Sequence, residues 1–315
     1  MAEYENAYNI WREIEEYDNI ALFGHVNPDG DCVSSVRAMK ALITKYFPNK
    51  KVYVSGSVPF NLVNLCYKSD DLSELENKEF LGILLDLNEG KRVEDKMYKK
   101  AKELAYIDHH MLNEEIINCP LYYKIVDAPS ATFVIYKFMK DLKLELNEEI
   151  AYYLYIGLVT DTQRFLHDSD VETFKMAEEL VKFSIDTKKI YKEVDKTSEA
   201  IIKFKVFVYT HYKFSKNACY LIIPKEAYLD LGLKQNDISH EIALLANLNG
   251  YHYWCFFIEN EDGKSVRCEY RSDGTRNVQS IAKKFNGGGH FAASGGTLYS
   301  MEDINKVIEY IDTLE

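Results

Sequence analysis

Four short apolar segments of the 315-residue chain each end on side chains that can bind a metal ion or a phosphate group. The segments lie at 20–24, 80–85, 104–107 and 150–159. The side chains that follow them are, in order, His25, Asp29 and Asp31, then Asp86, then Asp108, His109 and His110, and finally Asp161. Open α/β sheets keep their active sites at the carboxyl ends of their strands. We therefore expect these residues to meet in one site.

The types of these residues indicate a metal centre. Carboxylate oxygens with a few imidazoles are the ligands that divalent ions such as Mn²⁺ favour. The set exceeds what one ion needs, and it suits two ions about 3.5–4 Å apart that share a carboxylate. So much negative charge in one place would repel itself unless cations were bound. Taken singly, each aspartate is more typical of a helix N-cap or a turn, so the prediction depends on the whole set.

Composition limits the classes of partner. The net charge of −12 disfavours binding to long duplex nucleic acid, because that affinity comes from neutralising many phosphates. The six cysteines show no paired spacing that would indicate a zinc site or a disulfide framework. The acidic N-terminus has no signal-peptide pattern, and no apolar run approaches the roughly 20 residues of a membrane span. We expect a cytoplasmic protein with no membrane partner.

Residues 1–185 alternate short apolar runs with helical patterns, which predicts an α/β domain with a mainly parallel sheet flanked by helices. Strands are expected at 19–24, 51–55, 81–85, 104–107 and 122–126. Helices are expected at 5–16, 33–46, 131–140, 148–159 and 171–182. The charge-rich residues 186–200 are expected to form a linker that is helical in part.

Residues 201–315 predict a smaller α/β domain with a mixed sheet. Strands are expected where Val, Ile, Tyr and Phe are frequent, at 204–214, 218–223, 251–258 and 265–270. Helices are expected at 239–248, 277–285 and 302–314. A length of 315 residues suits two domains of this kind.

A glycine-rich loop in this second domain has the composition of an anion-binding site. Gly287, Gly288, Gly289 and His290 follow a helical pattern, and consecutive glycines let backbone amides approach a phosphate closely. Six basic and two acidic residues at 264–290 give a local charge of +4 in an acidic chain. Arg271 is the first choice for a phosphate clamp, because the guanidinium group fits phosphate oxygens. The alternative is a tight structural turn between a helix and a strand.

In order and context, the metal-binding candidates resemble the four motifs of the DHH phosphoesterase superfamily. These motifs are His25-Val-Asn-Pro-Asp29-Gly-Asp31, Asp86, Asp108-His109-His110 and Asp161. The pairs and runs Arg271-Ser272 and Gly287-Gly288-Gly289-His290 look like the DHH-associated C-terminal domain of the nanoRNase/pAp phosphatase branch. The resemblance covers nearly the whole chain.

The resemblance implies a role for each candidate. One metal ion would be held by His25, Asp29 and Asp86, and the other by Asp31, Asp86, His109 and Asp161, with Asp86 bridging. The catalytic residues would be His110, facing the scissile phosphate, Asp86, and Asp108, which would support the histidines from behind. Substrate would be bound by Arg271, Ser272, Gly287, Gly288, Gly289 and His290. The ions are expected to be two Mn²⁺, with Mg²⁺ and Co²⁺ as alternatives.

The resemblance also implies an activity, the hydrolysis of short oligoribonucleotides, linear dinucleotides such as pApA, and 3′-phosphoadenosine 5′-phosphate. Two positions depart from the family pattern, Ser34 and Gln163-Arg164, where Gly is common. Arg164 is therefore a further candidate for a substrate contact. The alternatives are an inorganic pyrophosphatase or polyphosphatase, a RecJ-like single-strand exonuclease, and a nucleotide-binding sensor without catalysis. A homodimer is left open as the assembly.

Overall fold

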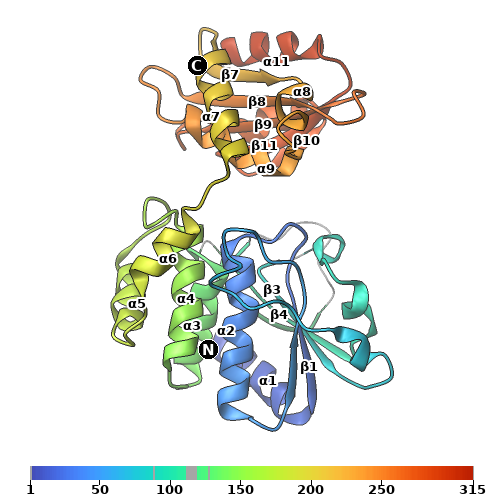
Figure 1. Cartoon of the computed structure of the whole chain (residues 1–315), viewed down its shortest axis with the longest axis vertical. Helices are drawn as coiled ribbons and strands as arrows, with labels where there is room; N and C mark the ends of the chain where they lie inside the picture. The colour runs from blue at the N-terminus through green and yellow to red at the C-terminus, as the bar shows by residue number, and fades with distance from the viewer. Residues whose placement is uncertain (1, 88, 111–118, 127, 315) are drawn as a thin grey trace. The chain divides into compact units, whose positions relative to one another are not determined.

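The computed structural model describes residues 2–87, 89–110, 119–126 and 128–314. The chain divides into two compact units, Met1–Lys196 and Thr197–Glu315, each with a sheet of its own (Figure 1). The boundary between the units falls inside the segment predicted as a linker, 186–200. No helix in the described ranges is both long and apolar enough to cross a membrane.

The sheet of the first unit has five parallel strands in the order β2-β1-β3-β4-β5. The strands are β1 (Asn19–Phe23), β2 (Lys51–Val54), β3 (Leu81–Leu85), β4 (Glu103–Asp108) and β5 (Leu121–Lys124). The central strand β3 is buried at every position, as expected for a continuous apolar run covered on both faces. The predicted α/β class with a mainly parallel sheet is confirmed.

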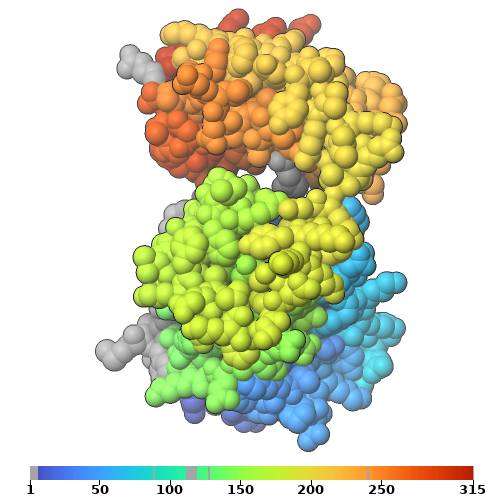
Figure 2. Space-filling model, turned by 60° about the vertical axis from the view of Figure 1, so that its left-hand side comes forward, coloured from blue at the N-terminus to red at the C-terminus, as the bar shows by residue number. Residues whose placement is uncertain are grey.

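Helices cover one face of this sheet, and short helical turns cover the other. The helices are α1 (Ala2–Glu16), α2 (Gly30–Tyr46), α3 (Ala131–Asp141), α4 (Glu148–Asp161), α5 (Val171–Val181) and α6 (Thr187–Val194). The 3₁₀ turns are η1 (Leu72–Leu75), η2 (Gly90–Arg92) and η3 (Lys96–Lys100). Helices α1 to α4 share one core with the sheet, and Leu72, Leu75 and Tyr98 belong to a second core on the opposite face. Helices α5 and α6 lie at the surface of the unit (Figure 2, yellow-green).

The second unit has a mixed sheet of six strands in the order β10-β11-β9-β8-β7-β6, with β7 and β8 parallel. The strands are β6 (Lys213–Phe214), β7 (Ala218–Ile223), β8 (Tyr253–Glu259), β9 (Val266–Ser272), β10 (Gly287–Gly289) and β11 (Ala293–Leu298). The helices are α7 (Glu199–His211), α8 (Glu226–Leu229), α9 (Gln235–Ser239), η4 (His240–Leu245), α10 (Val278–Lys284) and α11 (Asp303–Asp312). The predicted mixed sheet is therefore confirmed.

Two predicted elements are wrong. Of residues 204–214, predicted as a strand, 204–211 belong to helix α7, and the only strand in this described range is β6 (Lys213–Phe214). The buried positions of α7 are Ile201, Phe204 and Val208, spaced three and four residues apart, so helical periodicity outweighs the high strand propensity of the individual residues. The segment Gly287–Gly289, predicted as a loop, pairs with β11 as the antiparallel strand β10.

Candidate metal centre

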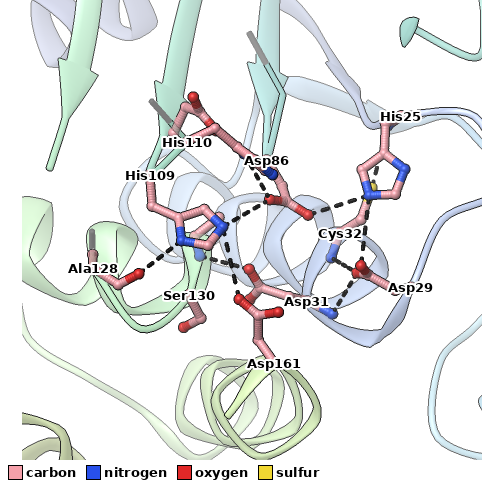
Figure 3. Close-up of polar contacts among 12 residues, drawn as sticks. His25, Asp29, Asp31, Cys32, Asp86, His109, His110, Ala128, Ser130 and Asp161 are labelled. Atoms are coloured by element: carbon pink, nitrogen blue, oxygen red, sulfur yellow. Dashed lines mark hydrogen bonds and ion pairs between the residues drawn. The ribbon is translucent and has the colours of Figure 1, made fainter. Parts of the chain in front are cut away.

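The predicted metal ligands converge at the carboxyl edge of the first unit's sheet (Figure 3). Asp86 follows β3, and His109 follows β4. Helix α2 begins beside them, with Asp29 as its N-cap, so that Asp29 and Asp31 lie at its first turn. Asp161 is the last residue of α4. Strand ends and helix ends from four separate segments thus bring the residues together, as the sequence predicts.

Asp86 lies at the middle of this cluster. Its Oδ2 atom is 3.4 Å from Nε2 of His25, and its Oδ1 atom is 3.4 Å from Nε2 of His109. One carboxylate therefore faces a histidine on each side, which is the arrangement that a bridging ligand requires. Asp86 has a φ of 60°, a left-handed conformation that is uncommon outside glycine and that is concentrated at functional sites.

The remaining aspartates complete two groups around Asp86. On one side, Oδ2 of Asp29 lies 3.8 Å from Nε2 of His25. On the other side, Oδ2 of Asp161 lies 3.7 Å from Nε2 of His109, and ligand atoms of Asp31, His109 and Asp161 all lie within 4.8 Å of one another. These contacts bring together the residues of the two ligand sets that the family resemblance implies.

The start of helix α3 holds the Asp31 carboxylate. Backbone N–H groups of Ala131 and Thr132 donate to its two oxygens at 2.5 and 3.1 Å, and the Thr132 hydroxyl donates at 2.8 Å. A helix N-terminus stabilises a carboxylate through its free N–H groups and its dipole. Asp31 is 2% exposed, so these bonds fix the direction of a carboxylate that is out of reach of bulk water.

The charges of the cluster alter its titration. Burial, followed by the charge of Asp86, raises the pKa of Asp31 to about 7, and burial with the charge of Asp31 raises the pKa of Asp161 to about 9. Burial opposes the charge on His109, but the Asp86 carboxylate outweighs it and raises the pKa of His109 to about 10. The raised pKa values mean that Asp31, Asp161 and His109 retain protons, and these protons offset the negative charge of the cluster. Bound cations would offset the same negative charge. The donor set of carboxylates and imidazoles therefore fits divalent metal ions.

Behind the cluster, a short chain of contacts fixes His110. Its Nδ1 atom lies 2.7 Å from Oδ1 of Asp108, which is fully buried at the end of β4. The Nζ atom of Lys124, on the neighbouring strand β5, lies 3.4 Å from the other oxygen of Asp108. The His110 side chain is about one-third exposed, so its ring is oriented by Asp108 and remains partly accessible.

The sequence reasoning missed Cys32 as a neighbour of this cluster. The backbone N–H of His25 donates to the Cys32 sulfur at 3.3 Å. Burial raises the pKa of the Cys32 thiol to about 11, so it packs beside His25 as a neutral group. Its position directly after Asp31 is the sequence signal for this contact, whereas the spacing between the cysteines carries no information on it. All six cysteines are free thiols.

In the second unit, three of the candidate substrate residues line a pocket of about 420 Å³ on the sheet, and Gly287, which pairs with Gly296 of β11, is not among them. Arg271, Gly288 and Gly289 line it. His290 is exposed at the end of β10. Ser272 is buried, and its hydroxyl donates to the carbonyl of Arg276 at 2.6 Å, which leaves it outside the pocket lining.

Comparison with known proteins identifies both units. The family model described as the DHH family, N-terminal domain, matches residues 19–158, and the DHHA1 domain model matches residues 216–314. A relative from Mycoplasma genitalium, named bifunctional oligoribonuclease and PAP phosphatase NrnA, is 33% identical over 303 residues, which cover 94% of this chain and 93% of the relative. The chain belongs to the DHH family.

Two further proteins are similar to the chain over nearly its full length. A Bacillus subtilis protein of the same name is 29% identical over 96% of both chains. The crystal structure of an exopolyphosphatase-related protein from Bacteroides fragilis superposes with a TM-score of 0.83, at 23% identity and over 98% of this chain and 95% of that one. That likeness establishes a common fold.

At the two positions that depart from the DHH pattern, the structure shows local contacts. Gln163, Arg164 and Phe165 follow Asp161 with φ values of 46°, 63° and 65°, a left-handed turn that glycine would adopt more easily. The Arg164 guanidinium forms an ion pair with Asp195, and both side chains are about half exposed. Ser34 is fully buried inside α2. Arg164 is thus occupied within the DHH unit, at the end of helix α6.

Proposed function

We propose that this chain is a metal-dependent hydrolase of phosphoester bonds that acts on short oligoribonucleotides and on 3′-phosphoadenosine 5′-phosphate. The observation that carries the proposal is the position of Asp86 between His25 and His109, with one oxygen directed to each. Relatives that match nearly the whole length of the chain bear the name of an oligoribonuclease and PAP phosphatase.

Two metal ions would be held by residues of the DHH unit. His25, Asp29 and Asp86 would hold one, while Asp31, Asp86, His109 and Asp161 would hold the other, and the carboxylate-rich set favours Mn²⁺. Such ions lower the pKa of a bound water and withdraw charge from phosphoryl oxygens. The protein contributes fixed ligand directions, because the N-terminus of α3 holds Asp31 and the φ of Asp86 aims one carboxylate between two histidines.

His110 would act on the substrate at the leaving oxygen. Asp108 accepts a hydrogen bond from Nδ1 of His110, so the opposite ring nitrogen is free for the phosphoester. When both ring nitrogens carry a proton, the imidazole can donate the one on this opposite nitrogen to the oxygen that departs. Because Asp108 is fully buried, it keeps the His110 ring in one orientation during the reaction.

The DHHA1 unit would bind the substrate. Arg271, Gly288 and Gly289 line its pocket, and His290 lies exposed at the end of β10. Arg271 already donates to the carbonyls of Tyr270 and Ser294 and pairs with Glu269, so its guanidinium is ordered before a substrate arrives. Ordered guanidinium groups bind phosphate oxygens with a small loss of freedom.

The competing functions fit the chain less well. An inorganic pyrophosphatase of this superfamily would carry a Ser-Arg-Lys-Lys type segment in its second domain and would lack the run Gly287 to His290, which is present here. A RecJ-like exonuclease needs a large surface for nucleic acid, whereas this chain carries a charge of −12. A sensor without catalysis would have no need for all six metal-binding side chains. The free thiols suit a reducing compartment, and we place the protein in the cytoplasm.

A hydrolysis panel tests the proposal. The full chain is supplied with Mn²⁺ and incubated with di- to pentaribonucleotides, 3′-phosphoadenosine 5′-phosphate and pyrophosphate. Turnover of the first two substrate types with little pyrophosphate hydrolysis is the expected result. Preferred hydrolysis of pyrophosphate, or binding of nucleotides without turnover, would contradict the proposed function and favour one of the alternatives.

A further inference from the structure

The sheet of the DHHA1 unit is unequally covered. One face packs against α10 and α11 along its length. The other face is covered by α7, α8 and α9 where it is formed by β7 and β8. Over β9, β11 and β10, this second face carries the pocket of about 420 Å³. The pocket is therefore the part of the sheet that the helices leave open.

Strand register gives this pocket a floor of bare backbone. Glu269 on β9 lies opposite Gly295 on β11, and Gly295 lies opposite Gly288 on β10. Residues directly opposite each other on neighbouring strands point to the same face of the sheet. On the open face, the row across the three strands therefore carries the Glu269 carboxylate and no other side chain, because its other two members are glycines. A methyl group added at Gly288 would meet no atom within 4 Å. The recess is thus open to a ligand beside Glu269.

Glu269 lies between two arginines of the same strand. Its Oε1 atom is 2.8 Å from Nη2 of Arg267, and its Oε2 atom is 3.0 Å from Nη2 of Arg271. The Glu269 side chain is 7% exposed, whereas those of Arg267 and Arg271 are 38% and 30% exposed. The carboxylate lies beneath, and the guanidinium groups remain accessible above it.

Other contacts fix the outer sides of both arginines. Arg267 donates to Oδ1 of Asn236 on α9 at 2.8 Å. Arg271 donates to the carbonyl of Ser294 on β11 at 3.3 Å. Each guanidinium is therefore held at two points, with Glu269 as the point that they share. The three charged side chains sum to +1, which suits one phosphate group.

We propose that Glu269 is a positioning residue that holds Arg267 and Arg271 ready for the phosphate of the substrate that is not cleaved. The inference rests on the proposed function and deepens it. Both 3′-phosphoadenosine 5′-phosphate and a 5′-phosphorylated dinucleotide carry a second phosphate besides the one attacked. A pair of ordered guanidinium groups selects for such a phosphate.

The opposite role for Glu269 would be to mask charge. In that case, removing the carboxylate would raise the charge of the three positions from +1 to +2 and would strengthen phosphate binding. If Glu269 positions the arginines, its removal lets both side chains move and weakens phosphate binding. The direction of the change therefore separates the two roles.

The test compares wild type with Glu269→Gln and Glu269→Ala in the full chain, using the dinucleotides pApA and ApA. On pApA, KM should rise about tenfold in Glu269→Gln, which keeps one acceptor oxygen, and further in Glu269→Ala, with kcat little changed. The rate on ApA should not change, so the preference for the 5′-phosphate should collapse. Glu241→Gln is the matched control, since it removes an ion pair with Lys205 (3.3 Å) outside the pocket lining.

Equilibrium binding of 3′-phosphoadenosine 5′-phosphate to the metal-free chain separates the possible failures. Equal or tighter binding by folded Glu269→Gln than by wild type would overturn the positioning role. If the wild type binds this nucleotide but hydrolyses no substrate, the proposed function is contradicted. The role of Glu269 is then decided by the same binding titration, which compares wild type with Glu269→Gln. Should Glu269→Ala fail to fold, as judged by circular dichroism, Glu269→Gln alone decides the outcome.

Discussion

The ammonium group of Lys124 lies 3.4 Å from Oδ2 of Asp108, and both side chains are buried, 6% and 0% exposed. The two residues are direct neighbours on the parallel strands β4 and β5. Among the residues that the structure describes, neither Nζ of Lys124 nor Oδ2 of Asp108 has a hydrogen-bond partner, so this ion pair is what compensates the two charges. Because the other Asp108 oxygen binds His110, the pair links the sheet interior to the site.

Replacing Lys124 with Met should destabilise the DHH unit. The change leaves the buried Asp108 charge with His110 as its remaining partner, and breaking a buried ion pair from one side costs about 3–5 kcal/mol. Urea unfolding of the metal-free chain measures the loss. Tyr123→Phe is the control on the same strand, because it removes a hydrogen bond to Asp141 (2.6 Å) and should cost about 1 kcal/mol. If both variants lost the same free energy of unfolding, the Lys124 charge would contribute no more to stability than one hydrogen bond.

Asp86→Asn should abolish turnover while keeping the fold. Asparagine has the same shape and tolerates the φ of 60° at this position, so the backbone should be unaffected. The amide cannot offer an anionic oxygen to both sides, and we expect a rate loss of about a thousandfold or more. Metal analysis after loading with Mn²⁺ should fall from about two ions per chain to one or fewer. His167→Ala, at an exposed position, serves as the control. An active Asp86→Asn protein would mean that this carboxylate is not a shared ligand.

The stability of the metal-free chain should fall as the pH rises from about 5 to 9. The pKa values of Asp31 and Asp161 are raised from 3.8 to about 7 and about 9, so the folded chain binds more protons than the unfolded chain above pH 4. That contribution is complete below the unfolded pKa and is lost as the pH passes the folded values. His109 acts in the same direction, because its pKa is raised from 6.5 to about 10. Burial opposes the charge on Asp86, but its two histidines lower its pKa. Asp86 therefore contributes stability that is lost only at acidic pH.

Thermal unfolding at several pH values checks this expectation. Metal ions bind the deprotonated ligands, so added Mn²⁺ should raise Tm more at pH 8 than at pH 6. A Tm of the metal-free chain that stays level or rises between pH 5 and 9 would contradict the assignment of trapped protons to this cluster.

The sequence predicted the first sheet closely because its strands are continuous apolar runs between polar segments. The predicted strand 81–85 coincides with β3 (Leu81–Leu85). The strand predicted at 204–214 is wrong because its aromatic and β-branched residues favour a strand individually, whereas Phe204 and Val208 lie together on one buried helical face. The run Gly287–Gly289 predicts a loop because consecutive glycines after a helical pattern let backbone amides approach a phosphate closely. The structure pairs it with β11, where close backbone approach excludes larger residues at Gly287 and Gly289.

The sequence predicts the site residues that directly follow a strand. It does not predict contacts between residues on two different strands, because these depend on how the strands align in the sheet. Lys124 lies sixteen positions after Asp108 and meets it only through the pairing of β4 with β5. By composition alone, Glu269 is one of two acidic residues in the basic segment 264–290. Its signal was nevertheless present, because Arg267, Glu269 and Arg271 alternate along one strand and must share a face.

The glycines of β10 provide a final prediction, since two adjacent positions should fail in different ways. A methyl group at Gly287 would lie 2.1 Å from the carbonyl oxygen of Gly295, so Gly287→Ala should separate β10 from β11 and lower Tm. Gly288 has open space at the same position, and Gly288→Val should keep Tm while filling the pocket beside Glu269. The Gly288 variant should therefore raise KM for short oligonucleotides with kcat and metal content unchanged. If Gly288→Val bound substrate as well as wild type, the recess between Glu269 and β10 would not be part of the binding site, and His290 would have to act from the outer edge of the sheet.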